Sequence, residues 1–113
     1  MITLLKMAKG IGRRFIKERE LVIDLSEKKV TVNSEEVKIS PVEFFLLRFL
    51  AVNKGKVVSA DQLLTYLWKR DIFLLEDGLD VIMDTLISKI EDGQFIPKYI
   101  IKDNNNSYRF LEV

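Results

Sequence analysis

The chain has 113 residues, of which 48% are hydrophobic and 31% charged, so it can form one domain with a single compact core. It has no cysteine and no histidine, which excludes disulfides, thiolate catalysis and cysteine-based zinc sites and removes the commonest general base and metal ligand. The formal net charge of +1 gives no overall attraction to nucleic acid, so an electrostatic argument must be local. We therefore expect no enzyme, no cofactor and no metal site, and the apolar runs are too short to cross a membrane.

The first twenty residues form a basic segment in which six lysines and arginines face two glutamates, a local charge of +4. Leu4, Ala8, Ile11 and Phe15 recur at helical spacing, which predicts an amphipathic helix. Two interpretations stay open: a linker from an upstream domain, or a basic arm that contacts phosphates or a partner. The segment lacks the long apolar stretch of a secretory signal, so we expect a cytoplasmic protein.

An antiparallel sheet of three strands is expected next. Apolar and polar residues alternate in three stretches, 21–25, 30–32 and 37–39, and polar residues separate them. Period-two alternation is typical of strands with one buried face. We therefore place the domain boundary at residue 20 and expect one domain over 21–113.

Two helices follow, each with a capping signal at its start. Ser40 can cap the first, with Pro41 in its first turn and Glu43 returning the capping bond, and Gly55 suits its left-handed end. Ser59 begins the second capping box. We predict that Phe44, Leu47, Leu64 and Trp68 pack in the core or at its edge.

A loop over 69–77 leads to a third helix over 78–91. Its inward stripe recurs at i, i+4, i+7 and i+11 and comprises Leu79, Met83, Leu86 and Ile90. A hairpin follows, with strands at 99–101 and 107–111, a core residue at Tyr108, and an asparagine-rich turn that tolerates positive φ. The order of elements predicts an α+β winged helix-turn-helix with an N-terminal antiparallel sheet, three helices and a C-terminal β-hairpin wing.

Four segments in order resemble the OmpR/PhoB-type effector domain at the C-terminus of bacterial response regulators. They are the helix opening at 39–47, the Gly-x-Val-Val-Ser and Leu-Leu pattern at 55–68, the Leu-Asp-Val at 79–81 and the Tyr-Arg-Phe at 108–110. The resemblance implies a four-stranded N-terminal sheet, with a further strand in or before residues 15–22. It also implies transcription control through DNA binding in a two-component system, with the third helix in the major groove.

The positions that would read DNA depart from this family. Its arginine-rich recognition helix is replaced by a stretch in which Lys89 opposes Asp80, Asp84 and Glu91, so residues 78–91 carry a charge of −2. The arginine of the family's wing turn is replaced by asparagines. A negative helix opposes the groove, because phosphate contacts supply most non-specific affinity. We therefore expect modest DNA affinity, or charge supplied by the N-terminal segment.

The candidate DNA-binding residues lie on the third helix and the wing. They are Val81, Ile82, Thr85, Ser88, Lys89, Lys102, Asn104, Asn105 and Arg109.

The main alternative is a winged-helix module for protein–protein interaction with weakened or lost DNA reading. Val81, Ile82 and Ile87 are predicted to be apolar and outward-facing, and the loop over 69–77 is rich in large apolar residues. In the family this loop is associated with RNA polymerase. We therefore also expect contact with RNA polymerase or another protein through 69–77, and homodimerisation. The alternative is that the apolar residues of this loop simply pack over the core.

Overall fold

The computed structural model describes residues 14–91, 96–103 and 106–112. The chain divides into two compact units, residues 1–38 and 39–113, and each is described by itself. Within the described residues no helix is long and apolar enough to span a membrane.

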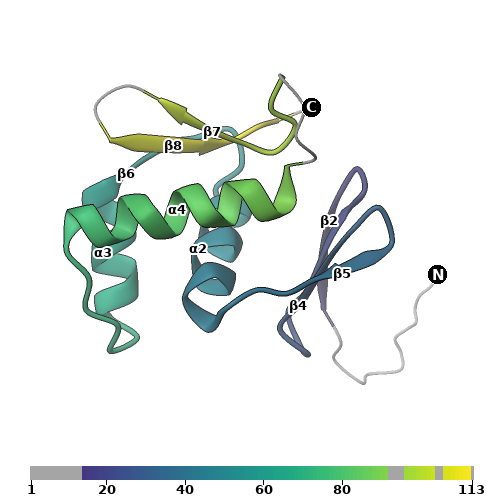
Figure 1. Ribbon diagram of the computed structural model, residues 1–113, viewed down its shortest axis with the longest axis horizontal. Helices are drawn as coiled ribbons and strands as arrows, with labels where there is room; N and C mark the ends of the chain where they lie inside the picture. The colour runs from purple at the N-terminus through teal and green to yellow at the C-terminus, as the bar shows by residue number, and fades with distance from the viewer. Residues whose placement is uncertain (1–13, 92–95, 104–105, 113) are drawn as a thin grey trace. The chain divides into compact units, whose positions relative to one another are not determined.

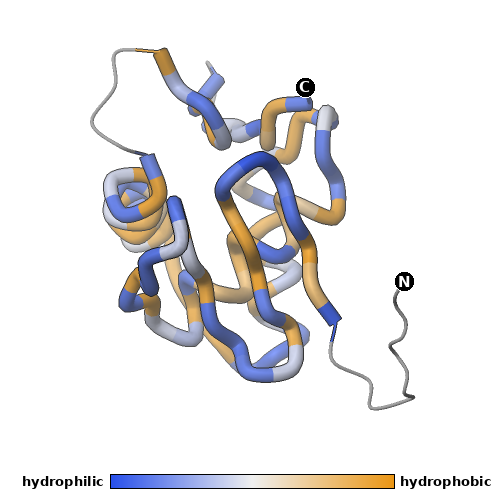
Figure 2. The backbone as a smooth tube through the Cα atoms, turned by 90° about the vertical axis from the view of Figure 1, so that its right-hand side faces the viewer, coloured by the Kyte–Doolittle hydropathy of each residue, from blue (hydrophilic) through white to orange (hydrophobic). Residues whose placement is uncertain are grey.

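The described part of the first unit is a four-stranded antiparallel sheet with the strands in chain order. They are β2 (Phe15–Glu18), β3 (Leu21–Asp24), β4 (Lys29–Val32) and β5 (Glu35–Val37). The strands carry hydrophobic stretches and the turns between them are hydrophilic (Figure 2). The meander predicted from alternation is confirmed, although its last strand covers 35–37 and not the predicted 37–39, and β2 is the fourth strand implied by the family resemblance.

Strand β2 corrects one expectation about the N-terminal segment. Phe15 lies in a strand and pairs with Asp24, so it does not belong to an amphipathic helix. The other three residues of the predicted stripe lie outside the described part of the chain. The sheet extends across residue 20, and the boundary placed there stays a prediction.

Helix α2 (Pro41–Val52) opens the second unit and begins as the sequence predicts. The Glu43 amide donates to Ser40 Oγ (3.1 Å), and the Ser40 amide donates to Glu43 Oε1 (2.8 Å), which completes the capping box. Gly55 follows the helix with φ of 85°, a left-handed conformation that costs glycine little. Its amide donates to the Phe110 carbonyl (2.8 Å).

Strand β6 (Val57–Ser59) and helix α3 (Ala60–Trp68) come next. Ser59 and Gln62 form a second reciprocal capping box, as predicted. Strand β6 was not predicted from the sequence; it forms because Val57 and Val58 pair with Arg109 and Tyr108 of the hairpin. Two residues are too few to show alternation in the sequence.

Helix α4 (Glu76–Ile90) lies across α2 and α3, with the hairpin of β7 (Ile100–Asp103) and β8 (Ser107–Phe110) alongside it (Figure 1). It starts two residues earlier than predicted, with Leu75 as an N-cap that makes no side-chain hydrogen bond. The first turn therefore gains Glu76 and Asp77, whose carboxylates favour the positive end of the helix dipole. Absence of a polar cap explains why the start could not be found from capping signals.

The core of the second unit joins all three helices to the three-stranded sheet β6-β8-β7. The inward stripe of α4 is confirmed, since each of its four residues is at most 1% exposed, and Phe44, Leu47 and Tyr108 are also buried. Leu64 is half-buried, at the edge of the core. The prediction for Trp68 was wrong, since it is 61% exposed. The buried face of α3 follows Leu63 and Leu67, and Trp68 lies one residue beyond that face.

Candidate nucleic-acid interface

One side of α4 is exposed along its length in the described part of the chain. Val81 is 65% exposed, and Thr85 and Ser88 are exposed, on the side opposite the buried stripe. The 3.6-residue period sets this division, because residues at i, i+4 and i+7 share a face. The geometry on which the regulator interpretation depends is therefore present.

Two apolar residues of α4 that were predicted to face outward are less exposed than expected. Ile82 and Ile87 are half-buried, so they lie on the flanks of the outward face. The Thr85 hydroxyl donates to the Val81 carbonyl (3.1 Å), which leaves its oxygen to accept hydrogen bonds from a partner. The outward face is thus small and mostly uncharged.

Lys89 is held by a carboxylate from another helix. Its Nζ donates to Glu43 Oε1 at 2.7 Å, and the Glu43 side chain is only 5% exposed. Burial raises the pKa of Glu43, but the Lys89 hydrogen bond and the Ser40 amide outweigh burial, and the net pKa lies below its usual value. The pair links the start of α2 to the last turn of α4.

Lys102 of the wing is held by α4 itself. Its Nζ donates to Asp80 Oδ1, and the Tyr108 hydroxyl donates to the same oxygen at 3.1 Å. Burial and the Asp80 carboxylate raise the pKa of Tyr108, so its hydroxyl stays protonated and able to donate. These contacts fix the side of the hairpin against the first half of α4.

The other wing residues predicted to bind DNA are Arg109 and the asparagines of the turn. Arg109 Nε lies 3.7 Å from Asp103 Oδ2, within ion-pair range, yet this buried N–H has no hydrogen-bond partner among the described residues. Asn104 and Asn105 lie outside the described residues. Asn106 adopts φ of 56°, as expected for an asparagine-rich turn, and its Nδ2 donates to Glu76 Oε1 at 3.3 Å.

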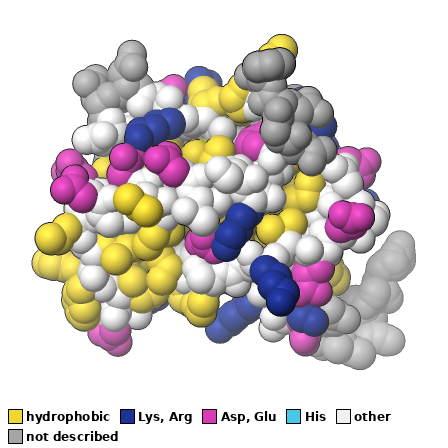
Figure 3. All heavy atoms as spheres, viewed as in Figure 1, with side chains coloured by type: hydrophobic (Ala, Val, Ile, Leu, Met, Phe, Trp, Pro, Cys, Tyr) yellow, Lys and Arg dark blue, Asp and Glu magenta, His cyan; other side chains and the backbone are white. Residues whose placement is uncertain are grey.

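Helix α4 carries four carboxylates and one ammonium, a net charge of −3. Acidic side chains gather along the edge of α4 nearest the hairpin (Figure 3). The three predicted cations, Lys89, Lys102 and Arg109, each lie within ion-pair range of a carboxylate of this chain. The charges of these three cations are therefore compensated by carboxylates, and α4 itself remains negative.

The end of α4 is tied to the wing by Glu91, which sequence reasoning did not single out. Its Oε1 accepts from the Lys98 amide (2.9 Å), and its Oε2 accepts from the amides of Tyr99 (2.8 Å) and Ile100 (3.0 Å). One carboxylate thus satisfies three backbone donors where β7 begins. Nothing in the local sequence signals this contact, since any acid at the helix end looks like a solvated residue.

A second surface is apolar and lies over the connection between α3 and α4 (Figure 3). Phe73 is 67% exposed and Leu75 is 82% exposed, and the rings of Trp68 and Phe73 meet edge to face with centroids 6.0 Å apart. Ile72 and Leu74 are half-buried. The alternative that the apolar residues of this loop pack over the core is therefore wrong for Phe73 and Leu75.

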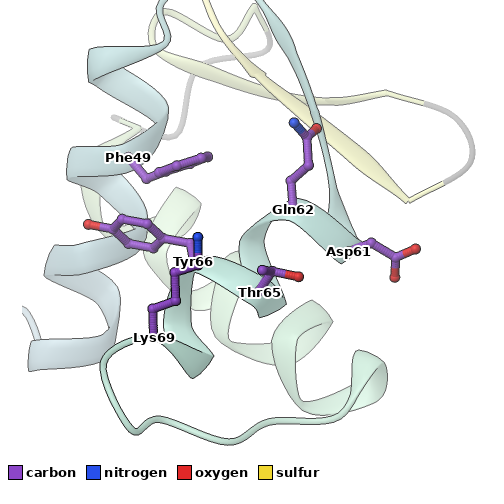
Figure 4. Close-up of a pocket in the computed structure, with 6 residues that line it drawn as sticks. All are labelled: Phe49, Asp61, Gln62, Thr65, Tyr66 and Lys69. Carbon is purple, nitrogen blue, oxygen red and sulfur yellow. The ribbon is translucent and has the colours of Figure 1, made fainter.

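A hollow of about 320 Å³ opens between α2 and α3 (Figure 4). Phe49 and Tyr66 form its aromatic side, with ring centroids 4.4 Å apart. Its other lining residues come from α3 and from Lys69, the C-cap residue that follows this helix. None comes from α4 or the hairpin, so the hollow is separate from the outward face. The described residues contain no cluster of acidic side chains that could hold a metal ion.

Comparison with known proteins gives a consistent result. Residues 34–110 match the family model for the C-terminal domain of transcriptional regulatory proteins. The chain is 31% identical over 96 residues to the KDP operon transcriptional regulatory protein KdpE of Escherichia coli K12, covering 85% of this chain and 43% of that protein. KdpE of Mycobacterium tuberculosis is 33% identical over 95 residues, covering 84% and 42%. The chain thus spans less than half the length of these relatives.

Solved structures agree. The response regulator DrrB of Thermotoga maritima, an OmpR/PhoB homologue, superposes with a TM-score of 0.77 at 28% identity and covers 87% of this chain and 44% of its own. The DNA-binding domain of Klebsiella pneumoniae RstA, solved with its RstA box, gives a TM-score of 0.74 at 28% identity, covering 87% and 97%. This chain accordingly belongs to the family of transcriptional regulatory protein C-terminal domains, as an OmpR/PhoB-type DNA-binding effector domain.

Proposed function

We propose that the domain binds double-stranded DNA by placing the outward face of α4 in the major groove, with the β7–β8 hairpin against the backbone. The observation that carries this proposal is the exposed row of Val81, Thr85 and Ser88 beside a hairpin fixed to the same helix. The proposed role is binding without catalysis, carried out in the cytoplasm where bacterial DNA lies.

The charge distribution on α4 and the wing favours weak binding to DNA. Non-specific affinity depends on lysines and arginines that displace counterions from phosphates. In the described part of this surface the predicted cations lie against carboxylates, and α4 is negative overall. Thr85 and Ser88 can hydrogen-bond to base edges, and Val81 can contact a thymine methyl group. We infer that recognition uses short-range contacts of neutral side chains more than charge.

A charge placed on the outward face tests the binding surface. Ser88→Glu should weaken binding to a fluorescein-labelled mixed-sequence DNA duplex by roughly fivefold, because one added repulsion of about 1 kcal/mol acts beside the phosphates. Thr65→Glu, on the exposed side of α3, is the matched control and should change binding little. Fluorescence anisotropy at low salt gives both affinities. Equal weakening by both substitutions, or no binding by the unaltered domain, would contradict the proposal.

The apolar surface of Trp68, Phe73 and Leu75 supports a second contact, with protein. Large exposed apolar residues that lie together mark interaction sites in soluble proteins. We propose that residues 69–77 contact RNA polymerase or another protein, and we retain homodimerisation as a separate prediction.

Substituting the centre of this apolar surface separates the two roles. Phe73→Ser should reduce transcription from a responsive promoter while leaving DNA affinity unchanged, because the ring is 67% exposed and contributes little to the core. Run-off transcription and anisotropy measure the two effects, and sedimentation velocity reports any loss of self-association. Unchanged transcription and unchanged association in the variant would eliminate the contact.

A further inference from the structure

Three carboxylates form a stripe along the side of α4 that faces the wing. Glu76, Asp80 and Asp84 are spaced four residues apart, so they lie on neighbouring turns of one side. Glu76 accepts from Asn106 Nδ2, and Asp80 accepts from Lys102 and Tyr108. Asp84 is close enough to add to the rise in the pKa of both Lys102 and Tyr108. The stripe therefore lines the space between recognition helix and wing.

Lys102 lies on β7 of the wing, the hairpin that is proposed above to meet the DNA backbone. Its side chain is 37% exposed and that of Asp80 is 46% exposed, so solvent and ligands reach both. A lysine ammonium that donates to Asp80 is engaged by an anion of its own chain. To bind phosphate it must leave Asp80, and the released carboxylate then repels the same phosphate.

We propose that Asp80 restrains DNA affinity by holding Lys102 in competition with the DNA backbone, and that Asp84 adds repulsion along the same edge. This inference rests on the proposed function. It makes Asp80 an affinity-determining residue within the recognition helix, where it acts through Lys102 and needs no contact with a base. Tyr108 keeps Asp80 turned toward the wing by its hydrogen bond to the shared oxygen.

Asp80→Asn provides the direct test, because the amide oxygen can still accept from Tyr108 while the negative charge is lost. We expect affinity for the mixed-sequence duplex to rise about three- to tenfold near 50 mM salt, with the slope of log K against log salt concentration steeper by about one, as for one added phosphate contact. Lys102→Gln should leave the slope of the unaltered domain unchanged. In the Asp80→Asn background it should abolish most of the gain.

Two further variants separate this coupling from a general charge effect. Asp84→Asn should give a smaller gain that largely persists when Lys102→Gln is added, because the hydrogen bond to Lys102 comes from Asp80 and Asp84 acts mainly by repelling the phosphate. Glu112→Gln makes the same change in net charge at a different place. Glu112 follows β8 at the end of the hairpin opposite the turn, and its substitution should alter DNA affinity by less than about twofold. Thermal unfolding of each variant by circular dichroism verifies that the fold is kept.

The outcomes distinguish the two levels of the proposal. Absence of binding by every variant at low salt would overturn the proposed function itself. Binding that is equal in Asp80→Asn and Glu112→Gln would leave the function standing and overturn the restraint. A lower salt slope for Lys102→Gln in the unaltered background would also overturn it, since Lys102 would then already contact phosphate.

Discussion

Replacing Glu91 with alanine should lower the free energy of unfolding by about 3 kcal/mol, a large fraction of the stability of a small domain. The carboxylate accepts three backbone hydrogen bonds, and Tyr99 and Ile100 are only 3% and 1% exposed. Without Glu91 the amides of these residues lose their hydrogen-bonding partner at a place with little access to water. Urea denaturation followed by far-ultraviolet circular dichroism measures the change. Trp68 is a poor probe because it is largely exposed.

Glu91→Gln is the control that isolates the acceptor oxygens. The amide oxygen of glutamine can replace Oε2, which accepts from the amides of Tyr99 and Ile100. The loss in unfolding free energy should therefore be about half of that caused by alanine. Glu36→Ala, on the exposed side of β5, should cost no more than about 0.5 kcal/mol. A loss below about 1 kcal/mol for Glu91→Ala would show that water satisfies the amides equally well.

The pair of Glu43 and Lys89 should make stability fall in mild acid. Since the pKa of Glu43 is lower in the folded protein than its ordinary value of 4.5, the unfolded chain takes up a proton more readily. The stabilisation from this group is complete above the unfolded pKa and is lost as the pH falls through the folded pKa. We therefore expect unfolding free energies measured from pH 7 down to pH 3 to fall most steeply below about pH 4.5.

Two substitutions assign this pH dependence to the pair. Glu43→Gln can retain the capping bond to Ser40, so it should cost about 1 kcal/mol at neutral pH and flatten the acid dependence. Lys89→Met leaves the buried Glu43 carboxylate without its cation and should lower the free energy of unfolding by about 2 kcal/mol at neutral pH. This loss is smaller than for a fully buried ion pair because Lys89 is 35% exposed. An acid dependence that is identical in both variants and the unaltered domain would assign the effect to other carboxylates.

The local elements could be predicted from sequence because their signals are local. Ser40 and Ser59 mark the helix starts through capping boxes of four residues, and the inward stripe of α4 follows from spacing alone. β6 could not be found because its pairing with β8 joins residues about fifty positions apart. The start of α4 was missed for a different reason, since Leu75 supplies no polar cap.

The candidate site was only partly accessible to the same reasoning. Periodicity predicted the exposure of Val81, Thr85 and Ser88, because exposure depends on the buried face of their own helix. The partners of Lys89 and Lys102 lie 46 and 22 residues away, and no local pattern connects them. Sequence alone therefore identified the cations without showing that the fold compensates their charge.

The turn end of the hairpin is joined to the starts of two helices. The Asn106 carbonyl accepts from the Ala60 amide (2.8 Å) at the head of α3, and its side chain donates to Glu76 at the head of α4. A hairpin fastened at its tip and also paired with β6 cannot swing independently of the helices. We expect the separation between wing and recognition helix to be preset, so a bound duplex would adapt its groove width to the protein, and sites in readily deformed DNA would be preferred.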